Sequence, residues 1–89
     1  MKFEYDPDKS EANKVKHGIN FEEAQELWND IDRVNIPVAH KGSDEERHAL
    51  IGKIALIHWT AIVTDRDGAW RIISVRRSRK EEKKLYEKK

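Results

Sequence analysis

Residues 54–77 read IALIHWTAIVTDRDGAWRIISVRR, in which two runs rich in Ile, Val, Trp and Thr flank the turn sequence Asp65-Arg66-Asp67-Gly68. Such runs are typical of β-strands, and a turn that ends in Gly tolerates the positive φ of a tight hairpin. We therefore predict strands over 54–64 and 69–77, joined by a hairpin over 65–68. The rest of the chain is expected to pack around this pair.

Two further strands precede the hairpin. One covers residues 47–52, which read RHALIG. The other begins near Arg33, where apolar residues recur at every second position and place Val34, Ile36 and Val38 on one face. Pro37 marks an edge strand or a strand end because it has no N–H to donate to a neighbour. Between them, the polar residues 39–46 predict a loop. Short connections between consecutive strands favour an antiparallel meander.

Helices are expected at both ends of the chain. After a short strand over 3–5, Asp6 is a plausible N-cap and Pro7 a first helical residue, in a helix that runs to His17 and ends at a left-handed Gly18. Asn20 and Glu23 resemble a capping box for a second helix, and Ser78 and Glu81 resemble one for a final helix. The second helix has its buried stripe at helical spacing, formed by Phe21, Ala24, Leu27 and Trp28.

The predicted fold is α+β, in the order β-α-α-β-β-β-β-α, with an antiparallel sheet and helices packed on one face. Its 89 residues predict a single domain over 1–89. The absence of cysteine excludes disulfide scaffolds and thiolate zinc sites. The longest nearly apolar run, 54–63, is shorter than the about 20 residues of a membrane span, and the first residues are charged rather than signal-like. We therefore expect no membrane association and a cytoplasmic location.

Charge is distributed unevenly along the chain. The first seventy residues carry nine Lys and Arg against fourteen Asp and Glu, whereas the last nineteen carry nine against three. The basic end favours binding of a polyanion, and a solvated Lys-rich helix is the alternative.

Metal and nucleotide chemistry have little support. The four histidines His17, His40, His48 and His58 lack the spacing of a metal site. Neither a Gly-rich loop between a strand and a helix nor a G-x-S-x-G elbow is present. We expect no cofactor and no bound metal.

The segment from Arg71 to the last helix offers different chemistry. Strict alternation along 70–77 places Arg71 and Arg77 on one face and Arg76 on the other. In the final helix, Arg79, Glu82 and Tyr86 share a face at i, i+3 and i+7. These groups suit metal-independent RNA cleavage, in which arginines hold the phosphate and a carboxylate or phenol moves protons. In the alternative, Glu82 pairs with Arg79 on the surface and Tyr86 packs on the sheet.

Segments at both ends of the chain carry a recognisable pattern. Residues 3–24 read FEYDPDKSEANKVKHGINFEEA, and residues 71–78 read RIISVRRS and are followed by Glu82 and Tyr86. Glu45-Glu46-Arg47 before a strand and Thr64 with Arg66 at the hairpin fit the same pattern. Over nearly its whole length the chain thus resembles the BrnT toxins of bacterial type II toxin-antitoxin modules. It departs from them at Ala55-Leu56, where a Gly or polar turn is expected, and strand pairing around 54–57 is therefore left open.

The resemblance implies a RelE-like fold, a ribonuclease that arrests translation and a BrnA-like antitoxin with a ribbon-helix-helix domain. Operator DNA would be bound only through the antitoxin, and a homodimer within the complex is compatible with the resemblance. Matching positions give the catalytic candidates Arg47, Arg66, Arg76, Arg77, Glu82 and Tyr86, with Lys16 and His17 as RNA-binding candidates. The basic segment adds Arg71 and Arg79 as further RNA-binding candidates.

Two questions stay open at this point. At His17, capping is favoured over catalysis, because a protonated imidazole is stabilised at a helix C-terminus. The competing function is a non-catalytic module whose basic end docks on nucleic acid or on an acidic partner.

Overall fold

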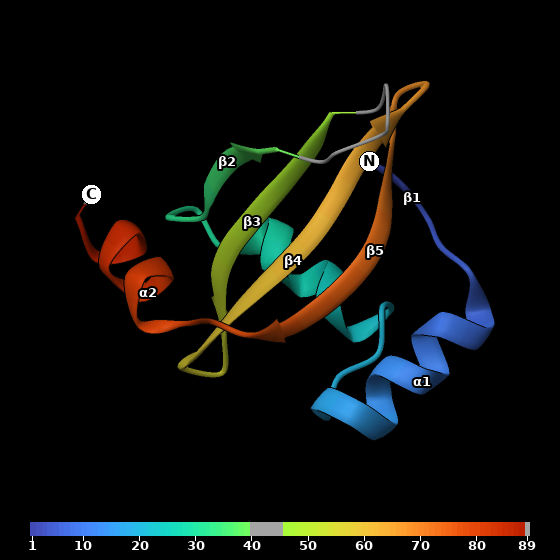
Figure 1. The fold of residues 1–89 in the computed structure, drawn as a ribbon, viewed down its shortest axis with the longest axis horizontal. Helices are drawn as coiled ribbons and strands as arrows, with labels where there is room; N and C mark the ends of the chain where they lie inside the picture. Colours follow the sequence, from blue (N-terminus) through green and yellow to red (C-terminus); the bar gives the residue numbers. More distant parts are fainter. Residues whose placement is uncertain (40–45, 89) are drawn as a thin grey trace.

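The computed structural model describes residues 1–39 and 46–88 (Figure 1). The predicted α+β class is confirmed. The elements are β1 (Lys2–Glu4), α1 (Pro7–His17), the 3₁₀ helix η1 (Glu23–Asn29), β2 (Val34–Val38), β3 (Arg47–Ile54), β4 (Ile57–Arg66), β5 (Ala69–Arg77) and α2 (Lys80–Glu87). The loop predicted over 39–46 lies almost wholly outside the described residues.

The sheet has five strands in the order β1-β5-β4-β3-β2. Strands β2 to β5 form the predicted antiparallel meander, but β1 pairs in parallel with β5, with Phe3 opposite Trp70. The wholly antiparallel prediction is therefore wrong at this edge. Phe3 also lies edge-on to Trp28 of η1 at 4.7 Å, so burial of this ring fixes the first strand beside the last.

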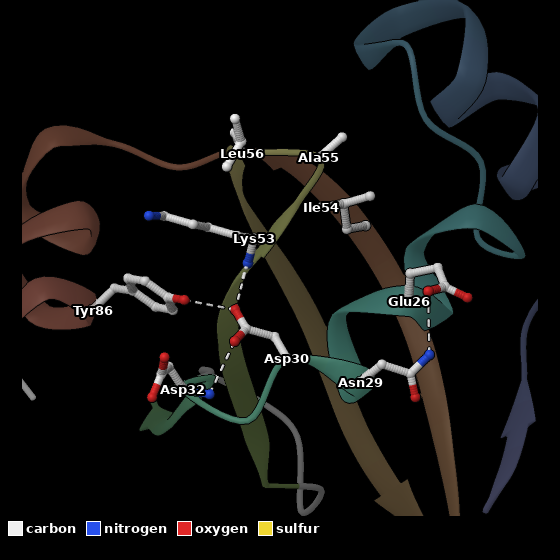
Figure 2. Close-up of a pocket in the computed structure, with 9 residues that line it drawn as sticks. All are labelled: Glu26, Asn29, Asp30, Asp32, Lys53, Ile54, Ala55, Leu56 and Tyr86. Atoms are coloured by element: carbon white, nitrogen blue, oxygen red, sulfur yellow. Dashed lines mark hydrogen bonds between the residues drawn. The ribbon is translucent and has the colours of Figure 1, made fainter.

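Two tight turns connect the central strands. Asp67 and Gly68 have φ of 52° and 84°, as the predicted hairpin requires. Ala55 and Leu56 have φ of 49° and 72° and join Ile54 to its partner Ile57 in a second two-residue turn, seen in Figure 2. The turn is thus where the family pattern places it. The strand bounds predicted as 47–52 and 54–64 shift, because Ile54 belongs to β3.

The caps of α1 are those predicted. The Asp6 carboxylate accepts the N–H of Asp8 at 2.9 Å, and Gly18, at φ 84°, donates its N–H to the carbonyl of Lys14 at 2.9 Å. Side chains of α1 then attach it to the sheet. The amide of Asn13 donates to the carbonyls of Ile19 and Val75, and its oxygen accepts the N–H of Val75 at 3.3 Å.

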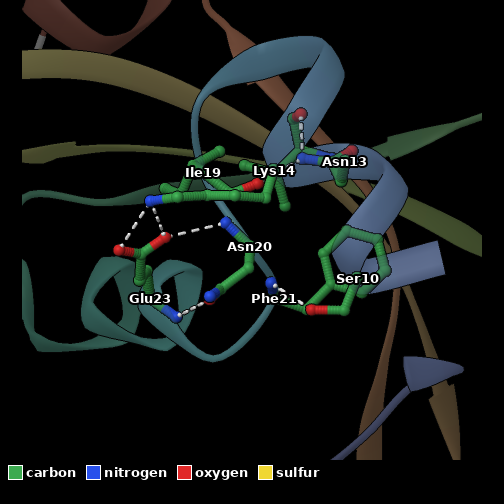
Figure 3. Close-up of polar contacts among 8 residues, drawn as sticks. Ser10, Asn13, Lys14, Ile19, Asn20, Phe21 and Glu23 are labelled. Atoms are coloured by element: carbon green, nitrogen blue, oxygen red, sulfur yellow. Dashed lines mark hydrogen bonds and ion pairs between the residues drawn. The ribbon is translucent and has the colours of Figure 1, made fainter. Parts of the chain in front are cut away.

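The second helix begins with the predicted reciprocal bonds. The Asn20 N–H donates to the Glu23 carboxylate at 2.9 Å, and the Glu23 N–H donates to the Asn20 side-chain oxygen at 2.7 Å (Figure 3). The segment is nevertheless a 3₁₀ helix and not an α-helix. Phe21, Ala24 and Leu27 recur every third residue, and this spacing aligns them on one face at three residues per turn.

The main core lies between η1 with its flanks and one face of the sheet. It is formed by Ile19, Phe21, Ala24, Leu27, Trp28, Leu50, Trp59, Ala61, Val63, Ile72 and Val75. Helix α2 instead contacts the other face, where Glu82 bonds to Thr60, so the prediction of helices on one face is wrong. It begins with one half of a capping box at Arg79, whose N–H donates to Glu82, and not with Ser78 and Glu81.

A bulge interrupts β5. Ile62 of β4 is paired with Ser74, but its neighbour Val63 is paired with Ile72, which leaves Ile73 as an extra residue on β5. The alternation predicted for this strand is therefore wrong beyond Ile72. Ile72 and Val75 both enter the core, and consequently Arg71 and Arg76 both point to the opposite face.

Candidate functional site

Four arginines lie on the sheet face opposite the main core. Arg47 of β3 is paired with Thr64 of β4, which is paired with Arg71 of β5. Residues paired across strands point to the same side of the sheet. Arg66 points to this side because it is two residues from Thr64 on β4, and Arg76 does so because the bulge shifts the alternation of β5. We call the surface formed by Arg47, Arg66, Arg71 and Arg76 the arginine face.

Glu4 lies at one end of the arginine face. Its carboxylate oxygen is 3.4 Å from the Nη1 of Arg71 and 3.8 Å from the Nη1 of Arg66. Side chains at these positions remain about a third or more exposed, so such contacts contribute little to stability. Among the described residues, Arg47 has no carboxylate partner. This end therefore offers guanidinium groups that solvent, and hence a ligand, can reach.

Glu82 lies at the other end and makes a closer pair. The Nη1 and Nη2 of Arg76 donate to its two carboxylate oxygens at 2.7 and 2.9 Å. The same carboxylate accepts the N–H of Arg79 at 2.7 Å and the hydroxyl of Thr60 at 3.1 Å. Burial alone would raise the pKa of Glu82, but these hydrogen bonds, led by Arg76, lower it to about 2. Glu82 is thus ionised and fully engaged at neutral pH.

The surface between the two ends is largely apolar. Ile36, Ala49, Ile62 and Ser74 lie in one row across β2, β3, β4 and β5. In the next row the buried hydroxyl of Thr64 donates to the carbonyl of Glu46 at 2.9 Å. Helix α2 contacts β3 and lies at one side of the sheet in Figure 1. The floor between the charged ends is thus made of apolar and hydroxyl side chains, of which Ala49 and Thr64 are buried.

Tyr86 belongs to a different part of the molecule. Its hydroxyl donates to Asp30 at 2.7 Å, in a pocket of about 530 Å³ between η1, the turn at 55–56 and α2 (Figure 2). Asp30 also accepts the N–H groups of Lys53 and Asp32. Burial and then the Asp30 carboxylate raise the pKa of Tyr86 to about 12. Glu82 and Tyr86, expected to act together from one helix face, thus bond to different partners in different directions.

In the non-functional alternative, Glu82 pairs with Arg79 on the surface and Tyr86 packs on the sheet. Glu82 does not pair with the Arg79 guanidinium; it pairs with Arg76 and accepts only the backbone N–H of Arg79. The expected packing of Tyr86 on the sheet is confirmed, because the residue is 7% exposed and its ring lies edge-on to His58 of β4 at 5.2 Å.

The remaining predicted residues lie away from the arginine face. Arg77 stacks over Trp59, a core residue, at 5.3 Å. Lys16 and His17 end α1, which packs beside β5 at the opposite side from α2 in Figure 1. The structure therefore brings together Arg47, Arg66, Arg71, Arg76 and Glu82, with the exposed Arg79 next to Glu82.

Sequence reasoning missed Glu4, Thr60 and Ser78 as contributors to this site. The Thr60 hydroxyl lies 2.8 Å from that of Ser78, and both residues are buried. A threonine flanked by apolar residues in a central strand was a usable signal, because a buried hydroxyl needs a partner.

Two negative findings apply to residues 1–39 and 46–88. They contain no group of three or more His, Asp or Glu side chains placed to hold a metal ion. None of their helices has the length and apolar character that crossing a bilayer demands. His40 lies outside this part of the chain.

Comparison with known families shows which family the chain belongs to. A family model described as the ribonuclease toxin BrnT of type II toxin-antitoxin systems matches residues 5–82. The chain belongs to the BrnT family. A search of curated proteins found no match. This BrnT protein is thus a ribonuclease toxin by family, with RNA as its target and an antitoxin as its partner. The matched span contains the arginine face and ends at Glu82, whereas Tyr86 lies beyond it.

Proposed function

We propose that this BrnT protein is a metal-independent endoribonuclease whose arginine face binds RNA and stabilises the transition state. The supporting observation is that Arg47 of β3 and Arg71 and Arg76 of β5 project to the same face of the sheet. Arginine remains protonated at all physiological pH and binds phosphate oxygens through its planar fork. A set of such groups suits the dianionic pentavalent phosphorus of RNA cleavage.

The proposed reaction is attack by the ribose 2′-hydroxyl on the adjacent phosphorus. The 2′-oxygen forms a bond to phosphorus as the 5′-oxygen of the next nucleotide leaves. The proton of the 2′-hydroxyl is lost to solvent, and the leaving oxygen takes up a proton. The products are a 2′,3′-cyclic phosphate and a 5′-hydroxyl. Guanidinium charge next to the phosphate lowers the barrier without a metal ion.

Proton transfer by Glu82 and Tyr86 finds little support. A carboxylate with a pKa of about 2 is a weak base, and a phenol with a pKa of about 12 is a weak acid whose hydroxyl is directed to Asp30. We therefore assign the catalytic effect mainly to the arginines.

We also propose the finer features of the biological role. The fold is RelE-like, RNA cleavage arrests translation in the cytoplasm, and the antitoxin is BrnA-like with a ribbon-helix-helix domain. The antitoxin covers the arginine face with an acidic segment, and operator DNA is bound through the antitoxin. Support comes from the family and from the excess of Lys and Arg in residues 71–89.

The decisive experiment is RNA cleavage by the purified protein in EDTA. End-labelling is expected to reveal 2′,3′-cyclic or 3′-phosphate ends. Arg47→Ala, Arg71→Ala and Arg76→Ala are each expected to reduce single-turnover cleavage about hundredfold, the effect of removing one transition-state donor. Lys9→Ala, at an exposed position on α1, is the matched control. Strict dependence on Mg²⁺, or 3′-hydroxyl ends, would refute the proposed chemistry.

One observation favours a second function, a non-catalytic binding module. In the described chain, the arginine face presents no group whose pKa is shown to suit proton transfer, since Glu82 is held ionised. Both functions predict salt-sensitive RNA binding, so binding cannot separate them. Turnover of RNA by pure protein, with the three arginine variants as negative controls, decides between them.

A further inference from the structure

We propose that Glu82 is a positioning residue, which together with Thr60 and Ser78 orients the Arg76 guanidinium so that its free donors face the RNA phosphate. The inference rests on the proposed function, because it assigns a role within the same site. Glu82 would then act only through Arg76 and would neither touch RNA nor transfer a proton.

The hydrogen bonds of Arg76 leave one edge of its guanidinium open. Glu82 takes one N–H of Nη1 and one of Nη2, and the carbonyl of Arg77 lies 3.3 Å from Nη1. An arginine has five N–H donors, so the Nε–H and the second N–H of Nη2 remain. In the described chain nothing accepts from either of them. These two point in the same direction and form a second fork that matches two phosphate oxygens.

The carboxylate that holds Arg76 is itself held by two other groups. Thr60, fully buried on β4, donates its hydroxyl to Glu82 and shares a hydrogen bond with Ser78. The backbone N–H of Arg79 donates to the same oxygen at 2.7 Å. Strand β4 and the first turn of α2 thus set the place of the carboxylate. The fixed carboxylate in turn fixes the orientation of the Arg76 guanidinium, because two parallel hydrogen bonds hold a planar group in one orientation.

Glu4 provides the internal contrast. It approaches Arg71 through one oxygen at 3.4 Å and Arg66 at 3.8 Å, without a bidentate bond. Arg71 is left to adjust to a ligand, whereas Arg76 is held before the ligand arrives. Preorganised donors are the ones that contribute most to transition-state stabilisation, because they need no reorganisation during the reaction.

The test is a double-mutant cycle on single-turnover RNA cleavage with Arg76→Ala and Glu82→Gln. Glu82→Gln is expected to lower the rate about tenfold to hundredfold, within the usual coupling of contacting residues, with little change in RNA affinity. In the Arg76→Ala background it is expected to have no further effect. Glu81→Gln, an exposed carboxylate on the same helix, is the control. A further loss in the Arg76→Ala background would give Glu82 a role of its own and overturn the inference.

A pH profile adds a readout that a proton-transfer role would change. The rate of Glu82→Gln between pH 5 and 8 is expected to keep the shape of the parental profile at a lower level. A profile that loses an ionisation on this substitution would overturn the inference. Thr60→Val, which keeps the shape of the side chain and removes its hydroxyl, is a milder variant if Glu82→Gln fails to fold. If folded Thr60→Val cleaved RNA at the parental rate, Thr60 would have no part in orienting Arg76.

The orientation of Arg76 can be measured without any activity. NMR of the guanidinium groups is expected to show slow rotation of Arg76 in the parental protein and fast rotation in Glu82→Gln. If the parental protein shows slow rotation and cleaves no RNA, the proposed function fails while the geometry holds. If it cleaves RNA and Arg76 rotates freely, the positioning role fails while the proposed function holds.

Discussion

The ionised state of Glu82 leads to a prediction about folding. Its pKa falls from the ordinary 4.5 to about 2 in the folded protein. A carboxylate whose pKa is lowered by folding stabilises the protein above its unfolded pKa, and this stabilisation is lost as pH falls toward the folded value. The relevant window is therefore from about pH 4.5 down to about pH 2. Glu82→Gln, which mimics the protonated acid, should remove this pH dependence.

The size of the effect follows from the pKa difference. About 2.5 pH units correspond to about 3 kcal/mol at 1.36 kcal/mol for each unit. The Glu82 side chain is 17% exposed and its partner Arg76 is 23% exposed, so solvent screens part of the interaction. We therefore expect about 2 kcal/mol after this reduction. Within the stability of a small domain, such a difference is readily measured.

Urea unfolding at several pH values provides the assay. At pH 7 the parental protein is expected to exceed Glu82→Gln by about 2 kcal/mol in unfolding free energy, and near pH 2 by close to zero. Glu81→Gln on the exposed side of α2 serves as the control and is expected to match the parental protein throughout. A gap that stayed constant from pH 7 to pH 2 would refute the reasoning, because the loss would then not arise from the ionised pair.

Three further predictions concern other parts of the molecule. Asn13→Ala should lower the free energy of unfolding in urea by about 2–4 kcal/mol, because it leaves the buried N–H and carbonyl of Val75 without their side-chain partner. A decrease below about 1 kcal/mol would show that water replaces the amide. Leu56→Gly should raise stability by about 0.5–1 kcal/mol, since Leu56 has φ 72° and is 88% exposed; a lower melting temperature would contradict this. Tyr86→Phe should lose about 1 kcal/mol of stability with its bond to Asp30. Its cleavage rate should stay within about threefold of the parental rate, and a drop of two to four orders of magnitude would restore Tyr86 as an acid or base.

Local features were the most predictable part of this fold. The Asp6 and Gly18 caps, the Asn20–Glu23 pair and the Asp67-Gly68 turn each depend on a few neighbouring residues, and the structure contains all of them. The 3₁₀ character of η1 was also present in the sequence, as a spacing of three between buried residues. Helical periodicity alone does not separate it from an α-helix when the segment is short.

Features that depend on distant parts of the chain could not be predicted in this way. The parallel pairing of β1 with β5 joins residues almost seventy positions apart, and it is decided by burial of Phe3 against Trp28. The direction of the Tyr86 hydroxyl depends on Asp30, which lies on another element. Helical spacing correctly placed Glu82 and Tyr86 on neighbouring turns, but it contains no information on the partner each side chain finds.

Because of the bulge at Ile73, the number of residues between Arg71 and Arg76 decides which face of the sheet each arginine points to. Arg71 and Arg76 are an odd number of steps apart, and Ile72 and Val75 are as well, so a regular strand would separate each pair across the sheet. One extra residue changes the parity for both pairs at once. Deleting Ile73 would therefore send either an arginine into the core or a core residue into water, whereas replacing it with another β-branched residue would leave both pairs in place. In this segment, the presence of a residue at position 73 therefore matters more for the fold than which β-branched residue it is.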